Sequence, residues 1–389
     1  MMASVTVHLS RGVGVRDSYI TLPCPRRMPD YKEEIERLEE ELRTTKYNKA
    51  TQHHIGLVKA KIAKLKERES QRSSGSKGDG FAVRKSGNAT VALLGFPSVG
   101  KSTLLSAITG AESKTGAYAF TTTTVIPGML SYKGAQIQIL DLPGIISGAA
   151  RGSGRGREVL SALRQADLIL FVVDATDHPE RQLSILRREL HDAHVRIGDR
   201  APDVRLENDT KGGVTIYKTV PLEMSDETIE SILREFRRMN TTIIIRDRIS
   251  VDELIDAIEG NKVYIRSAVI ANKSDLATAR ERRAAKRVVD LNVSATTGEG
   301  VEDLKELIFS RIGFYRIYLK EVGKEPDMVE PLIIRGPCTV KDVCMRLHRD
   351  FVDKFRFAKV WGSSAKFPAQ KVSIEHELFD EDVLEITLR

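Results

Sequence analysis

The chain has 389 residues, of which 41% are apolar and 30% charged, and its formal net charge is +7. This length predicts more than one domain, and the composition is typical of a soluble globular protein. The sequence excludes a membrane span because no run approaches the ~18 apolar residues required, and residues 1–29 contain no signal-peptide pattern. Its three cysteines lack metal-site or disulfide spacing, which indicates reduced thiols and a cytoplasmic location. The positive charge favours an anionic partner.

The N-terminal region divides into three parts. Residues 1–29 lack helix or core patterns, and we expect either a disordered tail or a misassigned extension upstream of a start at Met28. Residues 30–72 are predicted to form a helical hairpin, since apolar residues recur at helical spacing in two stripes. The first helix is rich in Glu and the second in Lys, so we expect the basic face to pair with the acidic helix rather than with RNA. Residues 73–87 are predicted to be a linker.

The segment VALLGFPSVGKST (91–103) predicts a strand, a phosphate-binding loop and the start of a helix, in that order. The loop backbone would surround phosphate, Lys101 would reach the β- and γ-phosphates, and Ser102 would ligate Mg²⁺. Predicted nucleotide contacts in this segment are Gly95, Phe96, Pro97, Ser98, Val99, Gly100, Lys101, Ser102 and Thr103.

Three further motifs predict that the nucleotide is GTP. In AQIQILDLPG (135–144), Asp141 would hold Mg²⁺ through water and Gly144 would sense the γ-phosphate. In NKSD (272–275), the Asp275 carboxylate matches the paired donors of guanine, which adenine lacks. An alternative interpretation of NKSD, a polar surface turn, is disfavoured by the strand before it. The third motif is SAT (294–296), which follows an apolar pair and would supply the last base-contacting loop. The full set of contacts expected from these motifs is Asp141, Leu142, Pro143, Gly144, Asn272, Lys273, Ser274, Asp275, Ser294, Ala295 and Thr296.

A threonine-rich segment is the predicted switch, in which one threonine closes over Mg²⁺ when the γ-phosphate is present. It consists of Phe120, Thr121, Thr122, Thr123 and Thr124, and the residues alone do not say which threonine is the ligand. The catalytic residue is unknown: Ile145 follows Gly144, where many GTPases place a water-orienting glutamine, so intrinsic hydrolysis is expected to be slow. The loop 144–157 is rich in Gly and Arg, which suits a solvated loop or a contact to RNA or protein equally well.

The overall pattern predicts an α/β fold with a doubly wound, mostly parallel sheet between about residues 88 and 316. Strands are expected near 90–94, 129–132, 135–140, 167–173, 267–271 and 288–293, with helices at 101–109, 157–165 and 301–312. An inserted small α+β domain is expected at about 178–262, because this spacing exceeds one helix and one strand. Residues 326–389 are predicted to form a further domain, in which a capping box at Thr339 and Asp342 starts a helix. Trp361 in this domain fits a core position better than a base-stacking one.

These motifs resemble those of the developmentally regulated GTP-binding proteins, a branch of the Obg-type GTPases. The resembling stretches are LLGFPSVGKSTLL (93–105), YAFTTTTVIPG (118–128), YKGAQIQILDLPGIISGAARGSGRGREV (132–159) and AKVWGSSAKFPAQKV (358–372). The resemblance covers about residues 30–389. It implies a P-loop GTPase domain with a C-terminal β-grasp (TGS) domain, and it implies Thr122 as the Mg²⁺ ligand beside Ser102. A hydrophobic residue at Ile145 is a habit of this family.

The resemblance also implies a translation-associated GTPase that engages ribosomes or ribosomal RNA, and eukaryotic members have small stabilising partner proteins. Potassium dependence stays open, because some potassium-dependent relatives carry asparagine where this chain has Ser98. We therefore expect a cytoplasmic, Mg²⁺-dependent, slowly hydrolysing GTPase switch, with K⁺ as a second candidate cofactor and without sequence-specific reading of DNA. One alternative is a nucleotide-stabilised scaffold with little turnover. Another, a related ATPase, conflicts with the intact Asp275.

Overall fold

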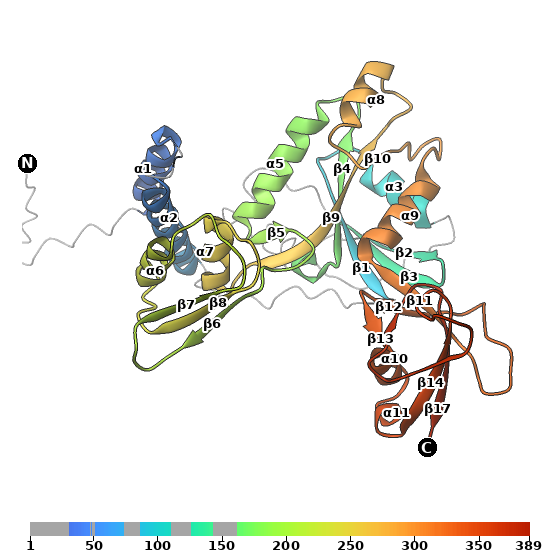
Figure 1. Cartoon of the computed structure of the whole chain (residues 1–389). Helices are drawn as coiled ribbons and strands as arrows, with labels where there is room; N and C mark the ends of the chain where they lie inside the picture. The colour runs from blue at the N-terminus through green and yellow to red at the C-terminus, as the bar shows by residue number, and fades with distance from the viewer. Residues whose placement is uncertain (1–30, 47, 49–50, 74–85, 110–125, 143–161) are drawn as a thin grey trace, which may run out of the picture. The chain divides into compact units, whose positions relative to one another are not determined.

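The computed structural model describes residues 31–46, 48, 51–73, 86–109, 126–142 and 162–389 (Figure 1). The predicted switch Phe120–Thr124, the residues Pro143 to Ile145 and the Gly/Arg-rich loop lie outside the described residues. The chain forms two compact units, one of residues 1–76 and 204–258 and one of residues 77–203 and 259–389. Each unit is described by itself.

The second unit contains a seven-stranded sheet in which six strands follow the order β10-β9-β4-β1-β3-β2 and β5 also pairs with β9. All pairings are parallel except the β2–β3 hairpin. Strands β1 and β4 are buried along their whole length, which explains their unbroken apolar sequences. The strands are β1 (Ala89–Leu94), β2 (Ile126–Tyr132), β3 (Ala135–Asp141), β4 (Leu168–Asp174), β5 (Val195–Ile197), β9 (Val263–Asn272) and β10 (Leu291–Asn292).

Helices pack on both faces of this sheet, so the predicted doubly wound α/β fold is confirmed. One core joins the sheet to α3 (Lys101–Thr109) and α9 (Val301–Ile312). The other joins it to α5 (Pro179–Asp192) and α8 (Ala279–Ala285). Helix α5 was not predicted: its residues fall in the expected insertion at about 178–262, but Leu183, Leu186 and Leu190 are buried in the core of the sheet. The insertion is therefore shorter than expected.

The C-terminal domain has a five-stranded sheet of order β12-β11-β17-β14-β15 and a separate β13–β16 pair. Its sheet includes β11, about ten residues before the domain start predicted at 326, because β11 pairs with β12 and β17 rather than with the GTPase-type sheet. The predicted capping box is present: Thr339 and Asp342 bond reciprocally at the start of α10. The elements are β11 (Phe314–Leu319), β12 (Leu332–Arg335), β13 (Cys338–Thr339), α10 (Val340–Leu347), α11 (Asp350–Asp353), β14 (Phe355–Trp361), β15 (Gln370–Val372), β16 (Glu377–Leu378) and β17 (Val383–Leu388).

The expected core position of Trp361 is wrong. Ala358 and Val360 on β14 are fully buried in the core of the domain. Because side chains alternate along a strand, Trp361 points to the opposite face of the sheet, where the Lys320 Nζ lies 5.3 Å from its ring centroid. Tryptophan identity alone predicts burial, but the register of β14 places this ring outside the core.

The first unit combines the predicted hairpin with the insertion. Helices α1 (Tyr31–Thr44) and α2 (Gln52–Ser73) share an apolar seam that includes Ile35, Leu38 and Val58. The insertion has a three-stranded sheet of order β6-β8-β7 covered by α6 and α7. Its elements are β6 (Val204–Asn208), β7 (Val214–Lys218), α6 (Asp226–Glu235), β8 (Thr241–Ile245) and α7 (Val251–Glu259).

Helix α2 also packs against the insertion, which the sequence did not predict. Ala60 is fully buried in the core of the insertion, and a Cβ added at Gly56 would lie 3.1 Å from Thr228 Cγ2. Lys64 Nζ bonds the Glu235 carboxylate at 2.9 Å, whereas Lys66 pairs with the acidic helix α1 as expected. The lysines of α2 therefore pair both with α1 and with the insertion. Within the described ranges, no helix combines the length and apolarity needed to cross a bilayer.

Candidate guanine-nucleotide site

The phosphate-binding loop follows β1 directly and ends at the first residue of α3. Its two glycines are required by close contacts. A Cβ at Gly95 would lie 2.3 Å from the Val172 carbonyl oxygen, and one at Gly100 would lie 2.4 Å from Asn272 Nδ2. Gly100 also has a φ of +89°, which disfavours any side chain. The loop is thus held tightly against β4 and against the end of β9.

Lys101 lies inside this loop with 8% of its surface exposed. Its ammonium donates to the carbonyl oxygens of Phe96 at 2.9 Å and Gly95 at 3.1 Å. Burial lowers the pKa of Lys101, and the nearby Asp141 carboxylate opposes this effect. The geometry places the Lys101 side chain inside the loop in which the phosphates of a nucleotide are expected.

The two predicted Mg²⁺-associated side chains in the described residues meet directly. Ser102 Oγ donates to Asp141 Oδ2 at 2.5 Å, which brings a hydroxyl from α3 beside a carboxylate from the end of β3. Both are hard oxygen donors of the kind Mg²⁺ prefers, so the residues fit the ion. No group of three or more His, Cys, Asp or Glu side chains among the described residues forms a metal site.

Asn272 connects three loops at the carboxyl end of the sheet. Its Nδ2 donates to the Val99 carbonyl oxygen at 2.9 Å, and its Oδ1 accepts from the Ala295 backbone N–H at 3.0 Å. The side chain is 2% exposed, so both bonds are protected from water. The expected tie to the phosphate loop is therefore present, and it extends to the third motif.

The other residues predicted to contact the base lie on the loops that Asn272 joins. Ser274 is buried and its backbone N–H donates to the Val293 carbonyl oxygen at 3.0 Å. Ser294 is fully buried, and its Oγ accepts from the Thr297 backbone N–H at 3.1 Å. Asp275 is exposed beside these anchored residues. A fixed loop with an accessible carboxylate is the arrangement that reading a guanine edge requires.

Sequence reasoning missed a third acidic residue at this site, Asp174 at the end of β4. Lys273 Nζ lies 2.7 Å from its Oδ2. Its Oδ1 accepts from the Thr176 hydroxyl at 2.7 Å and from the Thr176 backbone N–H at 2.9 Å. Burial acts to raise the pKa of Asp174, but the hydrogen bonds from Lys273 and Thr176 outweigh it and lower the pKa. The sequence did contain a signal for Asp174, because an acidic residue at the end of a buried apolar strand indicates a functional position.

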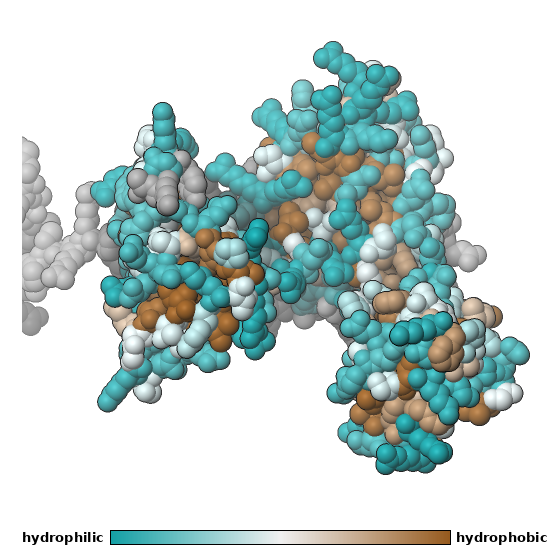
Figure 2. Space-filling model, viewed as in Figure 1, coloured by the Kyte–Doolittle hydropathy of each residue, from teal (hydrophilic) through white to brown (hydrophobic). Residues whose placement is uncertain are grey.

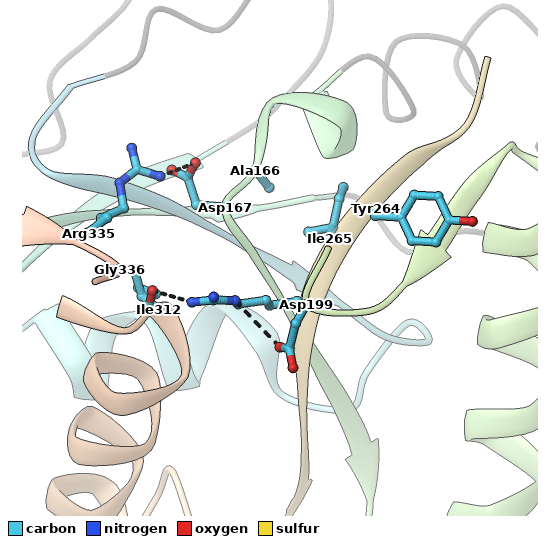
Figure 3. Close-up of a pocket in the computed structure, with 9 residues that line it drawn as sticks. Ala166, Asp167, Asp199, Tyr264, Ile265, Ile312, Arg335 and Gly336 are labelled. Carbon is cyan, nitrogen blue, oxygen red and sulfur yellow. Dashed lines mark hydrogen bonds and ion pairs between the residues drawn. The ribbon is translucent and has the colours of Figure 1, made fainter. Parts of the chain in front are cut away.

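A cavity of about 330 Å³ lies elsewhere in the second unit, and none of the predicted site residues lines it (Figure 3). Arg335 from the C-terminal domain pairs there with Asp167. Arg266 Nη1 donates to the Ile312 carbonyl oxygen at 2.7 Å, and its Nε lies 3.5 Å from Asp199. The lining comes from both the domain of the seven-stranded sheet and the C-terminal domain, and each arginine faces a carboxylate. We therefore interpret the cavity as the junction of these two domains rather than as a nucleotide site.

Comparison with known proteins identifies the family. Residues 90–201 match a family described as 50S ribosome-binding GTPase, residues 211–314 match the C-terminal region of that domain, and residues 315–388 match the TGS domain. An uncharacterized GTP-binding protein of Methanocaldococcus jannaschii is 51% identical over 367 residues, which cover 92% of this chain and 93% of that protein. Human developmentally regulated GTP-binding protein 2 is 41% identical over 358 residues, covering 91% and 98%. The chain belongs to the developmentally regulated GTP-binding protein family.

As a member of the developmentally regulated GTP-binding proteins, the chain carries a guanine-nucleotide-binding GTPase domain followed by a TGS domain. The Schizosaccharomyces pombe YchF GTPase aligns with 15% identity and a TM-score of 0.44, over 79% of this chain and all of that one. Nothing about the site follows from so distant a likeness.

Proposed function

We propose that this chain is a Mg²⁺-dependent GTPase with slow intrinsic turnover that acts as a cytoplasmic switch on ribosomes. The observation that carries the nucleotide part is the Asn272 side chain. Its two buried bonds join the phosphate loop, the NKSD loop and the third loop. These bonds hold the three loops together without a nucleotide, so they reduce the ordering of these loops that would oppose binding.

Different residues of the site would bind the phosphates, the guanine base and Mg²⁺. Backbone N–H groups of 95–103 and the Lys101 ammonium hold the phosphates, and Asp275 accepts from the guanine edge. Ser102 and Asp141 would hold Mg²⁺, which neutralises charge on the β- and γ-phosphates when bound. Thr122 is proposed as the switch ligand that closes when the γ-phosphate is present.

Slow hydrolysis is proposed because Ile145 offers no polar atom with which to orient water. The missing group would come from another loop, a monovalent cation or a partner. Single-turnover hydrolysis in K⁺ and in Na⁺ distinguishes the cation from the others. Rapid hydrolysis by the isolated chain in both salts would refute the slow intrinsic rate.

The nucleotide site is tested by titration calorimetry of Mg²⁺-GTP binding. Lys101→Ala and Ser102→Ala should abolish it, because each removes a group from the phosphate and Mg²⁺ contacts. Thr109→Ala, at the far end of α3, is a matched control and should leave the affinity unchanged. Retained micromolar affinity in both site variants would refute the assignment.

The ribosomal role is supported by the family description matched by residues 90–201, by the TGS domain and by the positive net charge. The test is co-sedimentation with ribosomes through sucrose, with the chain loaded with a non-hydrolysable GTP analogue or with GDP. We expect co-sedimentation in the GTP form only. Absence from the ribosome pellet in both forms, together with undetectable turnover, would instead favour a nucleotide-stabilised scaffold for protein partners.

A further inference from the structure

The β2–β3 hairpin connects the nucleotide site to the TGS domain (Figure 1). At one end of the hairpin, Ile126 pairs with Asp141, the proposed Mg²⁺-associated residue. The predicted switch segment 120–124 ends just before β2 begins. At the other end, Lys133 and Gly134 form the turn, and both have positive φ. The hairpin therefore joins the two segments that are predicted to sense the γ-phosphate to a single turn.

This turn contacts the TGS domain at the beginning of β12. A Cβ added at Gly134 would lie 2.7 Å from Pro331 Cγ and 2.9 Å from Pro331 Cδ. Ile333 of β12 is 6% exposed and belongs to the core of the seven-stranded sheet, together with Leu130 of β2 and Ala135 of β3. The TGS domain thus inserts a side chain into the core of the GTPase domain beside the hairpin. We call the packing of Gly134 against Pro331 and Ile333 the hairpin contact.

Helix α9 connects the hairpin to the TGS domain by a second route. Glu306 on α9 accepts from the Tyr132 hydroxyl at 2.8 Å and pairs with Lys133 Nζ at 2.6 Å. Three residues later, the Phe309 ring centroid lies 5.5 Å from Lys133 Nζ and 5.7 Å from the Arg316 guanidinium of β11. A cation from the hairpin and a cation from the TGS domain therefore contact the same ring.

Strand β12 is also linked to the strand that carries the phosphate loop. Arg335, at the end of β12, pairs with Asp167. The Asp167 Oδ2 accepts from the Thr90 backbone N–H at 2.8 Å. Thr90 lies near the start of β1, and β1 leads directly into Gly95. One strand of the TGS domain is therefore in contact with the hairpin and, through Asp167, with β1.

The junction between the two domains is partly polar and incompletely packed. The cavity of about 330 Å³ lies at this junction, and Arg335 lines it. Figure 2 shows hydrophilic and apolar residues interspersed on the TGS domain. Domains of one chain move relative to each other unless their interface is large and hydrophobic. This junction therefore permits two arrangements of the TGS domain.

We propose that the β2–β3 hairpin couples the nucleotide site to the TGS domain, so that the hairpin contact is stronger in one nucleotide state than in the other. By linkage, weakening this contact must then change the affinity for GTP relative to that for GDP. This inference rests on the proposed GTPase function, because it requires two nucleotide states. A static contact would hold the TGS domain in place without affecting the relative affinity.

The test is titration calorimetry of the full chain with GDP and with a non-hydrolysable GTP analogue. Pro331→Ala removes the ring atoms next to Gly134 and should change the ratio of the two dissociation constants about 3- to 15-fold. The upper value corresponds to two buried methylene groups whose contact exists in one state only. Pro337→Ala makes the same change at an exposed proline beyond β12 and should leave the ratio unchanged. An unchanged ratio in Pro331→Ala, or an equal change in Pro337→Ala, would overturn the inference.

A second variant, Gly134→Ala, approaches the hairpin contact from the other domain. Its Cβ would displace Pro331, so the ratio should change here too, while Pro331→Ala in the same chain relieves the clash. The effects of the two substitutions on the ratio should therefore be non-additive, and additive effects would contradict the coupling. Gly323→Ala is the control for backbone strain, because its φ of +80° matches the +81° of Gly134 and nothing lies within 4 Å of its Cβ position.

Hydrogen exchange of the wild-type chain tests the coupling without a substitution. The amides of β12 should exchange at different rates in the GDP form and in the GTP-analogue form, whereas those of β15, at the far edge of the same sheet, should not. A wild-type chain that binds neither nucleotide would refute the proposed function and the coupling with it. Binding of both nucleotides with equal exchange in β12 would refute the coupling alone.

Discussion

The ion pair between Lys273 and Asp174 predicts how tightly the base loop holds its nucleotide. The Asp174 side chain is 12% exposed and that of Lys273 is 31% exposed. Asp174→Asn keeps the size of the side chain and its bonds with Thr176 but removes the charge. Lys273 would then lose the partner that fixes it before the base arrives.

The loss of GDP-binding free energy in Asp174→Asn lies between two limits. An exposed ion pair contributes ~0–1 kcal/mol, and a hydrogen bond to a charged group contributes ~1.5–3 kcal/mol. Ordering a free lysine side chain costs up to ~2 kcal/mol. For this partly buried pair we expect ~1–2 kcal/mol, about 5- to 30-fold in GDP affinity. Because the pKa of Asp174 is lowered, the pair contributes fully above the unfolded pKa of ~3.9 and is lost as pH falls through the folded value.

The assay is displacement of a fluorescent GDP analogue by excess GDP in a stopped-flow instrument. Dissociation from Asp174→Asn should be 5- to 30-fold faster at pH 7.5, with association little changed. Asp177→Asn makes the same chemical change at an exposed position three residues away and should stay within twofold of the wild type. An inosine diphosphate analogue should lose as much as the GDP analogue, because Lys273 does not read the 2-amino group. Equal rates for the two variants would refute the reasoning.

Three further substitutions test other contacts. Gly100→Ala should lower GDP affinity at least tenfold by calorimetry, since its Cβ would displace Asn272 and φ is +89°; unchanged affinity would contradict this. Gly56→Leu should destabilise the first unit by ~1–3 kcal/mol through overpacking against Thr228. Faster hydrogen exchange in α2 with unchanged GDP affinity is the expected result, and wild-type exchange would count against it. Glu385→Gln should lower the melting temperature at pH 7, because it removes the charge that Lys320 and Lys359 bond. The difference from wild type should shrink below the unfolded pKa of ~4.3, as Glu385 becomes protonated. A constant difference down to pH 3 would exclude a stabilising role for these two ion pairs.

The parts of the fold that depend on local sequence could be predicted. A buried strand followed by Gly95 to Ser102 fixes the phosphate loop because few backbone paths fit those glycines. The Asn272 tie follows from the motif, and the capping box at Thr339 needs only residues three apart. These features are decided within short segments, so the sequence alone was sufficient for them.

The parts that depend on distant packing could not be predicted. Helix α5 has an apolar stripe, but its assignment to the sheet or to the insertion depends on which core it joins. The small residues Gly56 and Ala60 give no signal of the surface they meet. The position of Trp361 depends on the register of β14, and the pairing of Asp174 with Lys273 depends on β4 and β9 being neighbours. Each is fixed by tertiary contacts between segments far apart in sequence.

The central claim, that this site reads guanine, is tested most directly by changing Asp275 to Asn and measuring affinities for GDP and for xanthosine diphosphate. In the proposed site the carboxylate would accept from two guanine donors, and losing two charge-assisted bonds should weaken GDP binding about 100-fold or more, ~3 kcal/mol. Xanthine carries an oxygen in place of the 2-amino group, and the Asn amide can donate to it, so its affinity should rise. A variant that keeps the wild-type preference for GDP would contradict the account.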